Sequence, residues 1–150
     1  MKNLLILFAL VSIFIASACT NKLDDKENNK NLIKRMIERV DAEGASAYEE
    51  FVASDAIWHS PGGYAEVKAA FTNEKHTIDD VVAEGDKVVA RFTLRATNTG
   101  EYMSIPPTGK EVTFTVLTIY RIMDSKIVEG WFLFDALGLL EQIKPDSSSY

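Results

Sequence analysis

The feature that most limits the possible folds is a series of strand-like segments in the second half of the chain. They cover residues 77–84, 87–97, 111–122 and 127–134, and all are rich in β-branched and aromatic side chains. Within 87–97 the even positions are apolar and most odd positions are polar, the two-residue period of a strand with one buried face. Short turns lie between the segments at Gly85–Asp86, Thr108–Gly109 and Asp124–Ser125. Such turns favour hairpins, so the pattern predicts an antiparallel sheet.

Helical patterns precede and follow these segments. Apolar residues recur every three or four positions over 32–40, which predicts an amphipathic helix that ends at Gly44. Ser46 and Glu49 form a capping-box pattern that predicts a second short helix, and a third is expected after Pro61, with Val67, Ala70 and Phe71 on its buried side. Residues 136–143 predict a short C-terminal helix. Helices followed by strands indicate an α+β domain with three N-terminal helices packed on one face of a curved, mostly antiparallel sheet.

The N-terminus has the pattern of an export signal. Lys2 is followed by an apolar run, residues 4–18, that is shorter than the roughly 20 residues needed to span a bilayer. Ala16 and Ala18 suit a cleavage site, but the only cysteine, Cys19, follows at once, and this placement resembles a bacterial lipoprotein signal with a lipidated cysteine. We therefore expect an exported, membrane-anchored lipoprotein of the bacterial cell envelope, or alternatively a secreted or periplasmic protein.

The chain divides accordingly into four parts. Residues 1–19 are the expected signal peptide, 20–30 a polar tether, 31–144 one folded domain and 145–150 a loose tail. A length of 150 residues with 47% hydrophobic content can build one core but hardly two. The net charge of -6 and the lack of a basic run argue against nucleic acid as a partner.

Residues 100–140 closely resemble the SnoaL-like polyketide cyclases, also called ester cyclases. The elements that carry the resemblance are PPTGK at 106–110, YRI at 120–122, KIVE at 126–129, Trp131 and Asp135. The likeness continues more weakly through HSP at 59–61, HTIDDVVAEGDKVV at 76–89 and Arg91. It implies a cone-shaped barrel of the nuclear-transport-factor-like class with an internal pocket, and neither a metal ion nor an organic cofactor.

The resemblance also implies a reaction and a catalytic group. The cyclases close a ring by an intramolecular aldol reaction on a polyketide ester, with an Asp at the end of the last strand as acid/base residue, and Asp135 matches that position. Desolvation by Trp131 and Phe134 would then strengthen Asp135 as a base. Asp135 also directly precedes the predicted helix 136–143, where Asp is a favoured N-cap. Asp135 can therefore be a base, a cap, or both.

The remaining candidates surround the expected pocket. His59 is a second catalytic candidate, or a histidine at a strand end, and His76 is expected to be exposed. The candidate substrate-binding residues are Asn98, Arg121, Tyr102, Met103, Trp131 and Trp58. Relatives commonly carry histidine where this chain has Asn98 and Gly130, so the pocket lacks two proton-handling side chains.

Two functions are compatible with these features. One is cofactor-free acid/base catalysis, an aldol-type cyclisation or isomerisation, on a small apolar carbonyl compound. The other is a non-catalytic envelope lipoprotein that binds a small hydrophobic ligand in the same pocket, which the export signal and the two replaced histidines favour. The expected partners are this ligand and, through Cys19, a membrane. A homodimer through the exposed sheet face is a further possibility.

Overall fold

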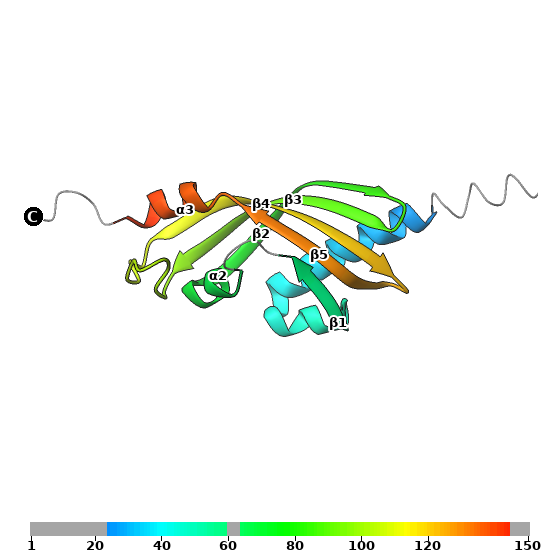
Figure 1. Cartoon of the computed structure of the whole chain (residues 1–150), viewed down its shortest axis with the longest axis horizontal. Coiled ribbons are helices and arrows are strands. Elements are labelled where there is room, and N and C mark those ends of the chain that lie inside the picture. Colours follow the sequence, from blue (N-terminus) through cyan, green and yellow to red (C-terminus); the bar gives the residue numbers. More distant parts are fainter. Residues whose placement is uncertain (1–23, 60–63, 145–150) are drawn as a thin grey trace, which may run out of the picture.

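The computed structural model describes residues 24–59 and 64–144 (Figure 1). A helix at 24–43 is followed by η1 (Ala45–Glu50), β1 (Val52–His59), α2 (Tyr64–Ala70), β2 (Phe71–Glu84), β3 (Lys87–Asn98), β4 (Glu111–Met123), β5 (Lys126–Phe134) and α3 (Ala136–Ile143). The predicted helices and the four predicted strands follow in the expected order, with the additional strand β1 between η1 and α2.

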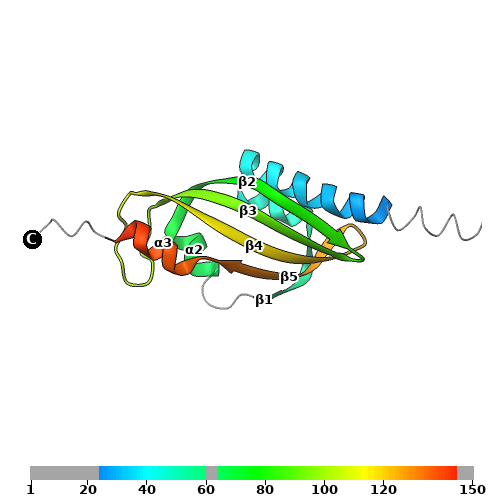
Figure 2. The same ribbon diagram turned by 90° about the horizontal axis from the view of Figure 1, so that it is seen from above.

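One curved sheet holds all five strands in the order β1-β5-β4-β3-β2. The pairs β2/β3, β3/β4 and β4/β5 are antiparallel, and β1 pairs with β5 in parallel. Three helical segments lie beneath the concave face: the helix 24–43, η1 and α2 (Figures 1 and 2). The C-terminal helix α3 directly follows β5 and lies beside the first residues of β4. The predicted α+β fold, with helices on a curved and mostly antiparallel sheet, is therefore confirmed.

The core lies between the concave face and the helices. Even-numbered residues of β3 and β4 are buried along almost their full length, as the alternation in 87–97 predicts. The helix 24–43 contributes Leu32, Ile33, Met36, Ile37 and Val40 from its apolar side. This helix begins earlier than expected, because residues 24–30 of the expected tether are already helical. Lys26 Nζ lies 2.6 Å from Glu84 Oε2 of β2, which fastens this first turn to the sheet.

Two local predictions fail. The capping box at Ser46 does not form: the N-cap of η1 is Gly44, and no side chain caps it. The segment is a 3₁₀ helix, since Phe51 N donates to Tyr48 O in an i to i+3 bond at 3.0 Å. The segment 52–59 was not predicted as a strand, because Ser54 and Asp55 interrupt its apolar pattern, although a strand end at His59 was one of the alternatives for that residue. It is an edge strand formed through its pairing with β5.

The third and fourth predicted helices are present. Val67 and Ala70 of α2 are buried, and Phe71 is buried as the first residue of β2 rather than on the helix. The helix α3 has the predicted bounds and buries Leu139 and Ile143. Within the described ranges, none of the helices is both long and apolar enough to cross a membrane.

Candidate active site

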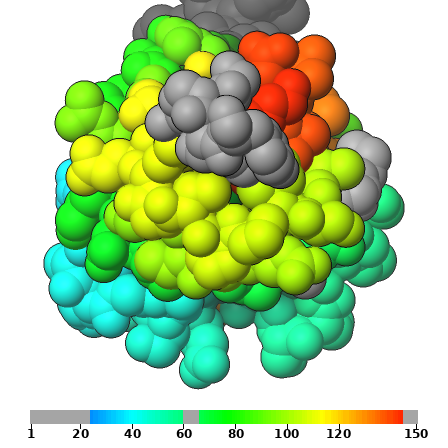
Figure 3. Space-filling model, turned by 90° about the vertical axis from the view of Figure 1, so that its left-hand side faces the viewer, coloured from blue at the N-terminus to red at the C-terminus, as the bar shows by residue number. Residues whose placement is uncertain are grey.

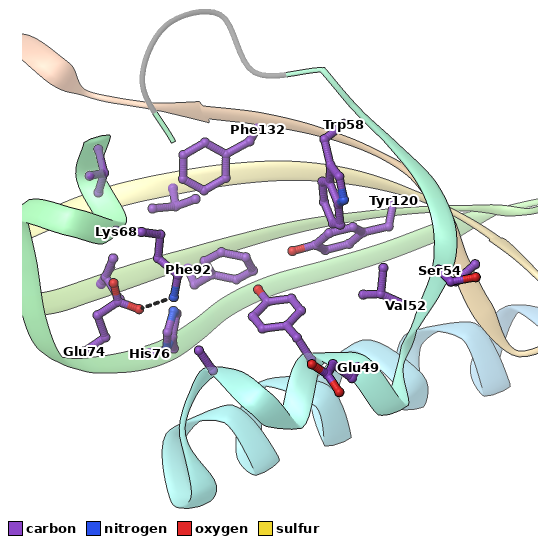
Figure 4. A pocket seen from close by; sticks show the side chains of 16 residues that line it. Glu49, Val52, Ser54, Trp58, Lys68, Glu74, His76, Phe92, Tyr120 and Phe132 are labelled. Carbon is purple, nitrogen blue, oxygen red and sulfur yellow. Dashed lines mark hydrogen bonds and ion pairs between the residues drawn. The ribbon is translucent and has the colours of Figure 1, made fainter. Parts of the chain in front are cut away.

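A cavity of about 550 Å³ lies between the concave face of the sheet and the elements beneath it (Figure 4). Its apolar lining includes Val52, Trp58, Val67, Phe92, Leu94, Val116 and Phe132. Its polar lining comprises Tyr48, Glu49, Ser54, Lys68, Glu74, His76 and Tyr120. An apolar hollow with a few polar groups is typical of a site for a small organic molecule.

Lys68 and Glu74 lie together on one side of the cavity, whereas Glu49 lies apart from them, below Val52 (Figure 4). Lys68 Nζ lies 3.2 Å from Glu74 Oε2, and both side chains lie close to the ring of His76 (Figure 4). The opposite side is formed by Trp58, with Tyr120 beside it. A ligand in this cavity therefore meets the Lys68–Glu74 pair and His76 on one side and the rings of Trp58 and Tyr120 on the other.

His76 is held in place by a carboxylate from the N-terminal helix. Its Nδ1 lies 2.7 Å from Asp41 Oδ1, and its backbone N–H donates to Asp41 Oδ2 at 3.0 Å. The ring meets Phe92 edge-on, with centroids 6.0 Å apart. The side chain is only 10% exposed, so the expectation of an exposed His76 is wrong.

The hydrogen bond to Asp41 selects the tautomer of His76. A carboxylate can only accept, so Nδ1 carries the hydrogen, and Nε2 of the neutral ring is left with a lone pair. Asp41 would also stabilise the imidazolium that forms when Nε2 takes up a proton. The pair has the arrangement of a general base with an orienting carboxylate.

Two bulges in β2 explain why His76 faces the cavity. The pairing with β3 shifts by one residue between Thr72 and Lys75, and again between Ile78 and Asp80. Each shift moves the following side chains to the other face of the sheet. Between the two bulges, Glu74, His76 and Ile78 are partly buried, whereas Thr77 is exposed. A sequence read at a constant period of two does not reveal these shifts, which is why Glu74 was missed and His76 was expected to be exposed.

Most of the sequence-predicted site residues lie elsewhere. Trp58 lines the cavity, whereas His59, Arg121 and Trp131 form a network on the other face of the sheet. His59 Nε2 is 2.8 Å from Glu129 Oε1, and Arg121 Nε donates to Glu129 Oε2 at 2.7 Å. The ring of His59 stacks on Trp131, with centroids 5.0 Å apart. Hydrogen bonds from His59 and Arg121 hold the pKa of Glu129 below its ordinary value.

Asn98 is a structural residue. It is 0% exposed, and its Nδ2 donates to Gly100 O at 2.8 Å and to Ala70 O at 3.3 Å. Its Oδ1 accepts from the backbone N–H of Thr108 at 2.8 Å and from the Thr108 hydroxyl at 2.9 Å. The amide therefore joins α2 to the loop between β3 and β4, and it does not line the cavity.

The same loop holds Tyr102 and Met103, which were expected to border the pocket. The loop covers one end of the molecule (Figure 3). Tyr102 is buried against Phe71, with ring centroids 5.4 Å apart, and Met103 is exposed in a tight turn. Neither side chain lines the cavity.

Asp135 is the N-cap of α3, one of the two roles expected for it. Its Oδ1 accepts from the backbone N–H of Gly138 at 2.9 Å. The side chain is exposed and does not line the cavity, so the expected desolvation by Trp131 and Phe134 is absent. Cys19, the expected lipidation site, lies outside the described residues.

In the described part of the chain, no group of three or more His, Cys, Asp and Glu side chains is arranged to hold a metal ion.

Known proteins share this fold and parts of this sequence. The family model described as SnoaL-like polyketide cyclase matches residues 30–143. Among proteins with curated descriptions, none matches this chain.

Several solved structures are similar to this chain in both sequence and fold. The chain is similar to AclR, a candidate hydroxylase from Streptomyces galilaeus, with 26% identity and a TM-score of 0.68 over 79% of this chain and 96% of that one. It is also similar to IdmH, a candidate polyketide cyclase from Streptomyces antibioticus, with 30% identity and a TM-score of 0.64 over 76% and 96%. A candidate cyclase from Acidithiobacillus ferrooxidans has 26% identity and a TM-score of 0.66 over 77% and 94%. The nuclear-transport-factor-like fold, its cavity and the family match over residues 30–143 agree, and the chain belongs to the SnoaL-like polyketide cyclase family.

Proposed function

We propose that the protein binds a small, largely apolar carbonyl compound in its cavity and catalyses a cofactor-free acid/base reaction on it, an aldol-type cyclisation or an isomerisation. The observation that carries this proposal is the His76–Asp41 pair on the Lys68–Glu74 side of the cavity. Membership of the cyclase family supports the reaction class.

The proposed chemistry begins with removal of a proton from carbon. His76 Nε2 takes a proton from the carbon next to the carbonyl group, and the electron pair of that C–H bond moves into the enolate. Asp41 stabilises the imidazolium through Nδ1. The ammonium group of Lys68, which is paired with Glu74, lies on the same side of the cavity and can donate a hydrogen bond to the enolate oxygen. The enolate then either attacks a second carbonyl carbon, whose oxygen takes the proton from the imidazolium, or takes that proton back at another position, and both routes restore the neutral imidazole.

The surroundings of His76 suit such a step. The ring is largely out of water, its tautomer is set by Asp41, and apolar residues form the adjacent walls. General base catalysis by a positioned histidine contributes about 10² to 10⁴ in rate. Asp135 has no part in this proposal, because its carboxylate is directed at the first turn of α3.

Deuterium exchange tests the proposal without knowledge of the natural substrate. The ketone 2-tetralone, an apolar bicyclic compound with acidic protons beside its carbonyl group, is incubated with the protein in D₂O, and loss of those protons is followed by NMR. We expect the parent protein to exceed the buffer rate, and His76→Gln to lose about a hundredfold of the enzymatic rate or more.

His59→Gln is the matched control for this experiment. His59 also pairs with a carboxylate, at 2.8 Å, but on the other face of the sheet, so the same substitution there should leave exchange unchanged. Asp41→Asn should slow exchange, because the amide no longer selects the Nδ1–H tautomer. Exchange by His76→Gln at the parental rate would contradict the proposed base.

A second candidate function is ligand binding without chemistry. It is supported by the apolar walls of the cavity, which suit an apolar ligand whether or not it reacts. This candidate predicts that 2-tetralone binds with no exchange above buffer, in the parent protein and in His76→Gln alike.

We also propose that the protein is exported and anchored to a membrane of the cell envelope through a lipid on Cys19. The support is the apolar run 4–18 and the cysteine that directly follows it. Such an anchor would hold the cavity close to the membrane, where apolar ligands concentrate.

A further inference from the structure

Trp58 forms part of one wall of the cavity, and its indole ring fits there because Gly130 has no side chain. Trp58 of β1 lies beside Gly130 of β5 in the parallel register. A Cβ atom added to Gly130 would lie 2.3 Å from Trp58 Cζ3 and 2.6 Å from Cε3. Real Cβ atoms essentially never approach another heavy atom this closely, so the indole ring occupies the space that any other residue at position 130 would need.

Space, and not backbone conformation, is the reason for this glycine. Gly130 is not among the residues with positive φ, so its backbone is open to any L-residue. It is buried in the middle of β5, where glycine otherwise weakens a strand. The close approach of an aromatic ring compensates for that loss.

Tyr120 supports the ring from the next strand. Tyr120 pairs with Gly130 across β4 and β5, so these two residues and Trp58 form one row across the sheet. The rings of Trp58 and Tyr120 meet edge-on at 6.3 Å and 87°. Both line the cavity, and Trp58 is still 46% exposed. An aromatic face is therefore held toward the cavity and remains open to a ligand.

We infer that Trp58, held by Gly130, is a specificity-determining residue that stacks on a planar, conjugated part of the ligand and discriminates against puckered rings. Offset and edge-on contacts between aromatic rings stabilise a complex beyond the effect of buried area, and a saturated ring cannot make them. The polar group of the ligand then faces the His76 side of the cavity (Figure 4). This inference rests on the proposed use of the cavity but not on proton transfer.

Two probes with the same carbon skeleton test the inference. The flat 2-naphthol and the saturated trans-decahydro-2-naphthol both carry one hydroxyl group on a bicyclic frame, and their affinities are measured by calorimetry. We expect the parent protein to prefer 2-naphthol by about tenfold, the upper range of an aromatic contact. Trp58→Leu should remove most of this preference, mainly by weakening 2-naphthol binding.

A double-mutant cycle separates the ring from its support. Gly130→Ala should reduce the preference nearly as much as Trp58→Leu, because the new methyl group displaces the indole ring. In the double variant, Gly130→Ala should add nothing further, since the ring is already gone. The indole N–H signals of the two tryptophans report the displacement directly, and Trp131→Phe assigns them.

Trp131→Leu is the matched control, because Trp131 contacts His59 and Lys87 rather than the cavity. It should leave the preference unchanged. Full preference in Trp58→Leu, additive effects in the cycle, or no measurable binding of 2-naphthol by the parent protein would overturn the inference. If His76→Gln loses exchange while the preference persists, proton transfer and stacking are separate properties. If the preference fails while His76-dependent exchange persists, only the role of Trp58 is refuted.

Discussion

Asp135 and Gly138 are matched to each other at the start of α3. The carboxylate accepts the backbone N–H of Gly138, and a Cβ atom at position 138 would lie 2.3 Å from Asp135 Oδ2. Glycine inside a helix normally lowers its stability. Here the lack of a side chain at Gly138 leaves room for the Asp135 carboxylate to cap the helix. The resemblance to the cyclases suggested a catalytic role for Asp135, whereas its local hydrogen bond is that of an N-cap.

The first prediction concerns this cap. Asp135→Ala should lower the free energy of unfolding by about 1 kcal/mol, whereas Asp135→Asn should change it little, since Asn caps about as well. Urea unfolding measures both. Gly138→Ala should also be destabilising, although alanine at an ordinary helix position would stabilise by about 1 kcal/mol.

The two possible roles of Asp135 separate in the same variants. If capping is its only role, Asp135→Asn keeps both stability and the rate of deuterium exchange from 2-tetralone. An Asp135→Asn protein that folds normally but has lost exchange would restore the catalytic assignment.

The helix α3 replaces a missing strand at one edge of β4. The pairing of β5 with β4 stops at Val116, so residues 111–115 of β4 have no β5 partner. The side-chain amide of Gln142 takes this place: Thr113 N–H donates to its Oε1 at 2.8 Å, and its Nε2 donates to Thr113 O at 2.9 Å. One side chain thus makes the pair of hydrogen bonds that a neighbouring strand would make.

The second prediction follows from this contact. Gln142→Ala should lower the free energy of unfolding by about 1 to 2 kcal/mol, because two backbone groups of β4 lose their partners to water. Gln142→Glu should have an intermediate effect, since the carboxylate can accept from Thr113 N–H but cannot donate. Glu141→Ala, on the exposed side of the same helix, is the control and should stay close to the parent protein in chemical denaturation.

Glu129 connects three strands on the other face of the sheet. It lies on β5 and pairs with His59 of β1 and Arg121 of β4. These hydrogen bonds hold its pKa below the ordinary value of 4.5 in the folded protein. The ionised form therefore stabilises the fold fully above the pKa of the unfolded chain, and this contribution is lost as the pH falls through the lower folded-state pKa.

The third prediction is a pH-dependent difference in melting temperature. Glu129→Gln should melt below the parent protein at pH 7, and the difference should shrink as the pH falls below about 4.5. Glu111→Gln, an exposed carboxylate on β4, is the control. A difference for Glu129→Gln that stays constant down to pH 3 would contradict the assigned interactions.

The strands show what sequence periodicity can and cannot predict. The segments 87–97, 111–122 and 127–134 were predicted nearly to their ends, because alternation and turn residues are local properties. The strand β1 and the bulges of β2 depend on pairing with distant residues. A one-residue shift reverses which side chains face the cavity, so the last three strands were predictable while β1 and the lining of the cavity were not.

The residues of the candidate site also could not be predicted from local sequence patterns, because they come from distant parts of the chain. Asp41 and His76 are 35 positions apart and meet only when the end of the N-terminal helix lies against β2. Neither the spacing nor the neighbours of either residue indicates the pair. Arg121, Trp131 and His59 were candidates, but the alternation along β4, β5 and β1 directs them to the other face of the sheet. Family membership thus predicted the fold better than it predicted the residues of the site.

The fourth prediction concerns the proposed membrane anchor. Cells that express the parent chain with a labelled fatty acid should yield labelled protein in the membrane fraction, and Cys19→Ala should yield none. Because Cys19 is the only cysteine, no other thiol can carry the lipid. Label that persists in Cys19→Ala would rule out lipidation at this residue.

The most direct test of the proposed site is a crystal structure of the protein with 2-naphthol, a stable enol that resembles the proposed enol of 2-tetralone. We predict that its ring lies in the cavity against Trp58, that its C1 carbon faces His76 Nε2 and that its oxygen lies within hydrogen-bond reach of Lys68 Nζ. The compound bound instead beside Asp135 or on the His59 face of the sheet, with the cavity left empty, would contradict the proposed site.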